Sequence, residues 1–383
     1  MGELIFKERL LSRLRFLPGL YLLLRKLRRI AVAAFVELFR AAGIGPRFGA
    51  ARGFVSALQQ VRDGEREGRV ILETQELPDL PRNSLIARAG MNQNGRQPWP
   101  VFWSKHPRAS LVGGSLALME EGKRLVGESV YGEDFQLRDP SYNYLVLPQA
   151  ESLPGCWTSL ISFWYYEYYH WFTDVVTRLA LLKEFPAETK FLVREPLRPF
   201  QRESLGMLGL LDRVRETSSR HLLVEEYYFS APVGMTGCTN PYTVEWLRSR
   251  FLPHRSLPET PPRFFIRRRG RTRGITNQEE IAEFFISKGW VAIHPEELSL
   301  AEQIAWFHNA EVIVGEHGAA FTNLLWCRPG CRVVELCPGN FLNGCYEAIS
   351  LCVGIDHQFK VFPAAPDSSF HVPLREIADI AVI

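Results

Sequence analysis

The stretch numbered 310–338 reads AEVIVGEHGAAFTNLLWCRPGCRVVELCP, and it decides the fold that we expect. Its apolar runs EVIV and VVEL predict two buried strands, and the segment AAFTNLLW between them predicts a helix. Strand, glycine turn, helix and strand make a βαβ unit, in which the N–H groups at the helix N-terminus attract an anion, typically a phosphate. We therefore expect a phosphorylated ligand at His317 and Gly318. The alternative is a structural turn in which His317 is a hydrogen-bonded loop residue.

The alternation of strands and helices is regular throughout the C-terminal third of the chain. Apolar runs at 263–266 and 290–293 predict two further strands. Capping-box sequences at 276–279 and 299–302 predict the starts of the helices that follow them. This pattern indicates a parallel, doubly wound sheet. Ligands of such sheets bind beyond the carboxyl ends of the strands, which is where His317 falls.

A second α/β region precedes the proline-rich segment 253–262, which predicts an inter-domain linker. In this region we predict strands at 158–163, 190–193 and 222–229, helices at 165–185 and 200–210, and a hairpin at 116–127. We interpret the chain as three parts, namely a basic segment 1–50, an N-terminal lobe 51–255 and a C-terminal lobe 256–383.

The composition is that of an ordinary folded protein. Hydrophobic residues make up 46% of the 383 residues and charged residues 23%, so a disordered chain is not expected. The net charge of +3 gives no global basic field, and we therefore expect no nucleic-acid partner. The seven cysteines include no CxxC pair and match no zinc spacing. A reduced, cytosolic compartment is the simplest interpretation.

The positive charge is concentrated at the N-terminus. Residues 1–50 contain ten Lys/Arg and three Glu. Basic residues interrupt every apolar block, so no run reaches the roughly 20 residues that span a bilayer, and no cleavage site indicates a secretory signal. We expect a basic amphipathic segment that binds the membrane surface. The alternative is an amphipathic helix packed on the body of the protein.

Two further clusters could carry chemistry. Five arginines occur between Arg267 and Arg273, directly after a predicted strand. Guanidinium groups bind phosphate oxygens in a bidentate way, so this run is a candidate phosphate site; the alternative is a solvated basic loop. His170 and Asp174 are four residues apart and share one helical face, where together they could deprotonate a hydroxyl. The alternative is that His170 packs in an aromatic wall.

Four phrases in this order resemble one family: EYYHWFTDVVTRL, FFIRRRGRTRGITNQEEI, PEELSLAEQIAWFHNAEVIVGEHGAAFTN and VVEL. The chain resembles the family 61 glycosyltransferases, which include bacterial capsular polysaccharide enzymes, plant xylan transferases and animal O-linked N-acetylglucosaminyltransferases. The resemblance covers roughly residues 165–338. It implies a two-lobed glycosyltransferase fold of the B type (GT-B), nucleotide-sugar donors and inversion at the anomeric carbon.

The resemblance also implies roles for individual residues. The family's HWxxD motif matches His170, Trp171 and Asp174, which implies that His170 or Asp174 is the catalytic base. Its other two motifs match the donor-binding candidates Arg268, Arg273, Asn277, His317, Gly318 and Ala319. The chain departs from the family at two positions, with Arg267 where serine is common and Gln278 where glutamate is common.

The resulting expectation is a GT-B-like α/β protein with two Rossmann-like lobes and a basic amphipathic N-terminal helix. It would transfer a sugar from a nucleotide sugar to a glycan or lipid-linked glycan, as a peripheral protein of the inner membrane in the cytoplasm. No Asp-x-Asp pair lies at the predicted donor site, so neither a metal nor another cofactor is expected. Two alternatives stay open, a pyruvyl or other activated-group transferase acting on polysaccharide and a non-catalytic nucleotide-binding scaffold.

Overall fold

The computed structural model describes residues 53–81, 84–88, 97–120, 124–130, 147–252, 257–269 and 274–380. The chain forms two compact units, each assembled from three separate segments. The first unit comprises Met1–Glu67, Ser104–Phe163 and Ser218–Phe229, and the second comprises Gly68–Trp103, Trp164–Thr217 and Ser230–Ile383. All the predicted site residues belong to the second unit. The predicted basic segment 1–50 lies outside the described residues.

The first unit is built on a mixed sheet. Its strands are β1 (Gly53–Val55), β3 (Pro100–Val112, from Ser104 onward), β4 (Ala117–Met119), β5 (Arg124–Val126), β6 (Glu151–Ser159) and β9 (His221–Ser230, as far as Phe229), in the order β1-β5-β4-β3-β9-β6. The antiparallel pairing of β4 with β5 confirms the predicted hairpin. The strand predicted at 158–163 is wrong in its position, because β6 ends at Ser159. Two short helices complete this unit, α3 (Ala57–Arg62) and the 3-10 helix η2 (Gly127–Val130).

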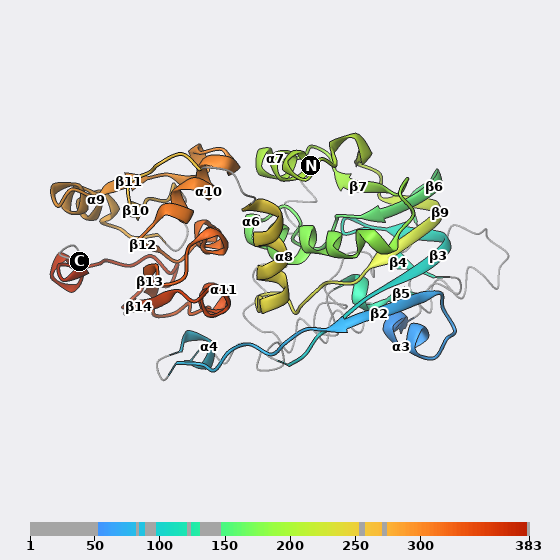
Figure 1. The fold of residues 1–383 in the computed structure, drawn as a ribbon, viewed down its shortest axis with the longest axis horizontal. Coiled ribbons are helices and arrows are strands. Elements are labelled where there is room, and N and C mark those ends of the chain that lie inside the picture. Colours follow the sequence, from blue (N-terminus) through green and yellow to red (C-terminus); the bar gives the residue numbers. More distant parts are fainter. Residues whose placement is uncertain are drawn as a thin grey trace. The chain divides into compact units, whose positions relative to one another are not determined.

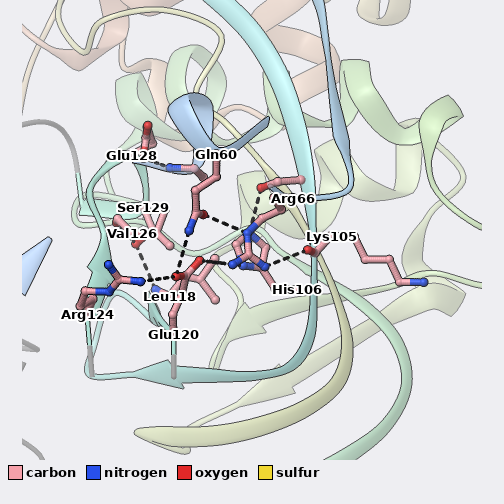
Figure 2. Close-up of polar contacts among 12 residues, drawn as sticks. Gln60, Arg66, Lys105, His106, Leu118, Glu120, Arg124, Val126, Glu128 and Ser129 are labelled. Atoms are coloured by element: carbon pink, nitrogen blue, oxygen red, sulfur yellow. Dashed lines mark hydrogen bonds and ion pairs between the residues drawn. The ribbon is translucent and has the colours of Figure 1, made fainter. Parts of the chain in front are cut away.

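A partly buried polar cluster connects the loop after α3 to the sheet of the first unit (Figure 2). Arg66 donates from Nη2 to Glu120 Oε1 at 2.6 Å, from Nη1 to the Lys105 carbonyl at 3.3 Å and from Nε to Gln60 Oε1 at 2.9 Å. His106 lies beside this cluster, where burial and the charge of Arg66 lower its pKa to about 3. A neutral His106 therefore adds no second positive charge beside Arg66.

The second unit contains a five-stranded parallel sheet, which confirms the parallel arrangement predicted for the C-terminal third. Figure 1 shows these strands in orange to red. They are β10 (Arg263–Ile266), β11 (Val291–Ile293), β12 (Val312–Glu316), β13 (Arg332–Pro338) and β14 (Asp356–Phe362), in the order β11-β10-β12-β13-β14. From β10 the chain first adds β11 on one side and then returns to add β12 on the other. This reversal makes the carboxyl ends of β10 and β12 a topological switch point, where open parallel sheets bind ligands.

The helices beside this sheet are α9 (Gln278–Ser287), α10 (Leu300–Asn309), the 3-10 helix η8 (Ala319–Trp326) and α11 (Cys345–Val353) (Figure 1). The capping box predicted for α10 is confirmed, since Ser299 and Glu302 bond to each other's backbone N–H groups. The one predicted for α9 is wrong. Asn277 stands at the N-cap but makes no capping bond, because its amide is engaged with the backbone of Val372 at 2.9 and 3.1 Å.

The segment that carries the HWxxD motif is helical, as predicted, but changes type along its length. It runs through α6 (Tyr168–His170), the π-helical turn η4 (Trp171–Val175) and the 3-10 helix η5 (Val176–Glu184). The remaining elements of the second unit are β2 (Gly68–Glu73), α4 (Leu85–Arg88), β7 (Lys190–Arg194), α7 (Pro199–Met207), η6 (Leu211–Arg213), β8 (Val214–Thr217), α8 (Pro241–Phe251), η7 (Pro295–Glu297) and η9 (Leu374–Glu376). Within the described residues, no helix has the length and apolar character needed to cross a membrane.

Candidate active site

A cavity of about 570 Å³ opens at the carboxyl edge of the five-stranded sheet. Its walls are formed by the chain that leaves β10, the chain that leaves β12, the first residues of η8, Tyr168 and the start of α7. Small-molecule sites in proteins have volumes of roughly 300–1,000 Å³. The cavity therefore has the size of a ligand site, and it lies at the switch point of the sheet.

Arg268 covers the turn at His317 and Gly318 that follows β12, which we call the glycine turn. A Cβ atom placed on Gly318 would lie 3.6 Å from Cδ and Nε of Arg268. The guanidinium donates from Nη1 to Glu316 Oε1 at 3.3 Å and to the His317 carbonyl at 3.4 Å. Among the described residues, the other N–H groups of this guanidinium have no protein acceptor. Arg268 can thus offer hydrogen bonds to an anion in the cavity.

Two neighbours hold Arg268 in place. Gln278 bonds to both sides of its backbone, accepting from Arg268 N at 2.7 Å and donating to Arg268 O at 3.1 Å. Glu316 pairs with the side chain of Arg268 and accepts from Ile275 N at 2.8 Å. Burial raises the pKa of Glu316, although the Ile275 N–H and the charge of Arg268 oppose this effect. The guanidinium is therefore positioned before any ligand binds.

His317 is buried and is not one of the residues that line the cavity. Its Nδ1 bonds to a carboxylate oxygen of Glu335, which the register of β12 and β13 places opposite Gly315. The other oxygen of Glu335 lies 3.1 Å from Nε2 of His357. Burial opposes the ionisation of Glu335, but the charge and hydrogen bond of His317 outweigh it and lower the pKa of Glu335 to about 2. The buried, ionised carboxylate of Glu335 therefore holds the glycine turn against the sheet through its bond to His317.

His170 and Asp174 form a second histidine–carboxylate pair. Nδ1 of His170 lies 2.7 Å from Oδ2 of Asp174, which also accepts from Thr236 Oγ1 at 2.6 Å. The His170 charge and bonds from His170, Thr236 and Thr173 lower the pKa of Asp174, despite burial that favours the neutral acid. An ionised carboxylate only accepts hydrogen bonds, so Nδ1 of His170 is the donor in this bond, and Nε2 is the ring nitrogen that remains for a proton from a hydroxyl.

Solvent access distinguishes the two partners of this pair. The side chain of His170 is 20% exposed, whereas that of Asp174 is 4% exposed. His170 also stacks on Trp164, with ring centroids 4.8 Å apart and planes at 23°, which holds the imidazole in one orientation. The geometry is therefore that of an accessible imidazole base with a buried carboxylate that orients it.

A chain of aromatic contacts joins the two histidines. The ring of His317 packs on Tyr346 with centroids 5.0 Å apart, Tyr346 contacts Tyr169 at 5.8 Å, and Tyr169 contacts His170 at 5.2 Å. The neighbouring Tyr168 lines the cavity and donates to Asn323 of η8 at 2.7 Å. The HWxxD segment and the glycine turn therefore belong to one packed region of the second unit.

One group of side chains in the described residues has the composition of a metal site. Potential ligand atoms of His317, Glu335 and Cys337 lie within 4.8 Å of one another and are buried. The atoms of this set already have protein partners, because Nδ1 of His317 bonds to Glu335 and the Cys337 thiol contacts the Glu335 carbonyl at 3.9 Å. Glu335 is also already paired with two histidines. All seven cysteines lie in the described residues and are free thiols.

The structure brings together most of the residues that the sequence indicates. Arg268, Gly318 and Ala319 line the cavity, whereas His317 lies behind the turn and His170 is linked to it through tyrosines. Asn277 is not among the lining residues and bonds instead to Glu280 and Val372. Arg273 lies outside the described residues.

Three residues that stabilise the site were not predicted from the sequence, namely the carboxylates Glu316 and Glu335 and the hydroxyl of Thr236. Glu316 is the last residue of the buried strand β12, and Glu335 is the middle residue of the buried strand β13. An acidic residue in such a run is rarely buried without a partner, and this signal could have identified both. Thr236 belongs to a loop far from Asp174 in the sequence, and no pattern marks it.

Residues 168–334 match the family model Glycosyltransferase 61. The matched segment contains the His170–Asp174 pair, Arg268 and the glycine turn at Gly318. This match supports a glycosyltransferase with donor and acceptor substrates. No curated protein matches the chain.

Proposed function

We propose that the protein is an inverting glycosyltransferase that uses a nucleotide-sugar donor and a glycan or lipid-linked glycan acceptor in polysaccharide biosynthesis. The observation that carries the proposal is the His170–Asp174 pair, with its oriented and accessible imidazole, in the same unit as a cavity where Arg268 covers a glycine turn. The first feature suits deprotonation of a hydroxyl, and the second suits binding of a diphosphate.

In this proposal the nucleotide diphosphate occupies the cavity. Arg268 and the backbone N–H groups that begin η8, after Gly318, bind the phosphate oxygens and stabilise the charge that develops on the leaving group. The acceptor hydroxyl attacks the anomeric carbon from the face opposite the diphosphate. Its proton moves to Nε2 of His170, the new C–O bond forms as the bond to the diphosphate breaks, and the configuration inverts. Asp174 stabilises the imidazolium that results.

We also propose roles for the two predicted lobes and for the basic segment 1–50. The two lobes predicted from the sequence would divide these roles, with acceptor residues in 51–255 and the donor site and five-stranded sheet in 256–383. Residues 1–50 would bind the cytoplasmic surface of the inner membrane and bring the enzyme to a lipid-linked acceptor. Support for the membrane role comes from the ten basic residues of this segment alone.

A thermal-shift screen of nucleotide sugars tests the proposed function. UDP-, GDP-, ADP-, dTDP- and CMP-linked sugars are added to the full chain, and a bound donor raises the apparent melting temperature by mass action. We expect one diphosphate class to stabilise the protein and the corresponding free nucleoside diphosphate to stabilise it as well. Absence of any shift across the panel would contradict the donor assignment.

The Arg268→Ala variant is expected to weaken nucleoside diphosphate binding by more than ~1.5 kcal/mol, the lower range for charge-assisted hydrogen bonds. The reason is that the Arg268 guanidinium lies directly over the Gly318 turn. Titration calorimetry with the diphosphate found in the screen measures this loss. Arg332→Ala is the matched control, because Arg332 begins β13 at the amino edge of the same sheet and pairs with Asp356. Equal affinities in both variants would remove Arg268 from the donor site.

The membrane role of residues 1–50 gives a separate prediction. Deleting residues 1–45 is expected to leave a soluble, folded protein that no longer sediments with vesicles containing anionic lipid. In the full chain, replacing Arg28 and Arg29 by Glu is expected to weaken sedimentation, because each basic residue near an anionic surface contributes roughly 1 kcal/mol. Aggregation of the truncated chain would favour the alternative in which this segment packs on the protein body.

A further inference from the structure

The turn that precedes the catalytic histidine presents a group of aromatic side chains toward solvent. Trp164 and Tyr165 are partly exposed, and Tyr166 is 37% exposed, one of the few large apolar side chains with that exposure among the described residues. We call these three residues the aromatic turn. Contiguous exposed apolar groups often mark an interface or a ligand site.

The backbone of the aromatic turn is fixed although its side chains are exposed. The buried amide of Gln201 donates to the carbonyl of Tyr165 at 2.8 Å, and Glu167 N donates to the carbonyl of Trp164 at 2.9 Å. Tyr165 and Tyr166 pack edge to face with centroids 5.5 Å apart. The rings are therefore held in place before a ligand arrives, which lowers the entropic cost of binding.

The aromatic turn contacts both the imidazole and a residue that lines the cavity. At one end Trp164 stacks directly on His170. At the other end the guanidinium of Arg198, a residue that lines the cavity, lies 5.8 Å from the centre of the Tyr166 ring. A molecule that rests on these rings would thus have one part near the base and another near the mouth of the donor cavity.

Polar groups suited to hydroxyl recognition accompany the rings. Arg198 and Glu167 are exposed, and among the described residues neither side chain forms an ion pair. Their N–H groups and carboxylate oxygens can donate to and accept from neighbouring hydroxyls. A sugar ring matches this combination, because it has an apolar C–H face for an aromatic ring and hydroxyls around its edge.

We propose that the aromatic turn, with Arg198 and Glu167, is the acceptor subsite and binds a saccharide ring of the acceptor. The proposal rests on the proposed function, since His170 must serve as the base for a hydroxyl placed here. It deepens that function by assigning acceptor recognition to a sugar unit. A lipid tail or a phosphate group, if the acceptor has one, lies elsewhere.

Saturation-transfer difference NMR on the full chain tests this subsite directly. The probes are methyl glycosides of glucose, galactose, mannose, xylose and N-acetylglucosamine, together with linear hexasaccharides of the same sugars. We expect at least one probe to receive saturation through its ring C–H protons. Tyr166→Ala should weaken that probe's affinity about tenfold. Tyr242→Ala is the control, because Tyr242 is a partly exposed tyrosine of α8 that does not line the cavity.

The outcomes distinguish this subsite from the proposed function. If no probe receives saturation, or if Tyr166→Ala and Tyr242→Ala bind the probe as the wild type does, the aromatic turn is not the acceptor subsite. Donor binding and slow donor hydrolysis measured on the same samples report on the donor site independently. If the saccharide test fails while the donor still binds and is hydrolysed, the proposed transferase function is retained. That result would favour an acceptor that is recognised through its lipid or phosphate.

Discussion

The His170→Ala variant is expected to lose turnover by roughly 10²-fold or more, the usual scale of a general base, while donor affinity stays within a few-fold of wild type. The imidazole is the accessible member of its pair, and the phosphate contacts around Arg268 are unchanged by this substitution. Initial rates with the donor found by thermal shift and a saccharide acceptor measure the loss. Titration of the nucleoside diphosphate measures the affinity.

Asp174→Asn should produce a loss of similar size, because an amide does not hold the Nδ1 proton of His170 as a carboxylate does. If Asp174 acts only by orienting His170, the double variant loses no more than His170→Ala alone, since residues that act as a unit are not additive. His371→Ala is the control, because His371 is exposed and outside the pair. Full activity in both single variants would show that neither residue is needed as the base and that the HWxxD segment serves packing only.

The parallel sheet and its ligand edge could be predicted because each depends on local patterns. β-Branched runs predict the strands on both sides of the turn at His317, and the capping sequence before Leu300 predicts the start of α10. In a parallel sheet the carboxyl ends of all strands lie at one edge, so the segments after 263–266 and 311–314 could be expected at the same edge. Arg268 and Gly318 follow these two ends, and the structure places them in contact.

The role of each site residue could not be predicted, because it depends on burial and on partners that are remote in the sequence. The spacing of His170 and Asp174 indicates a shared helical face, but only the structure shows that Asp174 is buried and bonded to Thr236 while the imidazole is partly exposed. Asn277 resembles a donor ligand by motif, yet its amide is occupied by Val372, which lies 95 residues away. His317 likewise matches a phosphate-binding residue by its position in the motif, but in the structure its Nδ1 bonds to Glu335.

Removing the buried carboxylate beneath the glycine turn should strongly destabilise the protein. Glu335→Gln keeps the shape of the side chain but removes the buried carboxylate that bonds to His317 and lies 3.1 Å from Nε2 of His357. Breaking a buried ion pair in this way costs about 3–5 kcal/mol. Chemical denaturation at pH 7 measures the change in the free energy of unfolding. Glu279→Gln is the control, because Glu279 pairs with Arg267 at the surface, where such a pair contributes at most about 1 kcal/mol.

The pH dependence separates the charge of Glu335 from its packing. The folded-state pKa of Glu335 is depressed from 4.5 to about 2, so the unfolded chain binds more protons than the folded chain between these values. The contribution of Glu335 is therefore fully present above about pH 4.5 and is lost as the pH falls toward 2. Wild type and Glu335→Gln should differ most near neutral pH and converge in acid. A difference that stays constant over this range would show that the substitution acts through shape or hydrogen bonding, and that folding does not lower the pKa of Glu335.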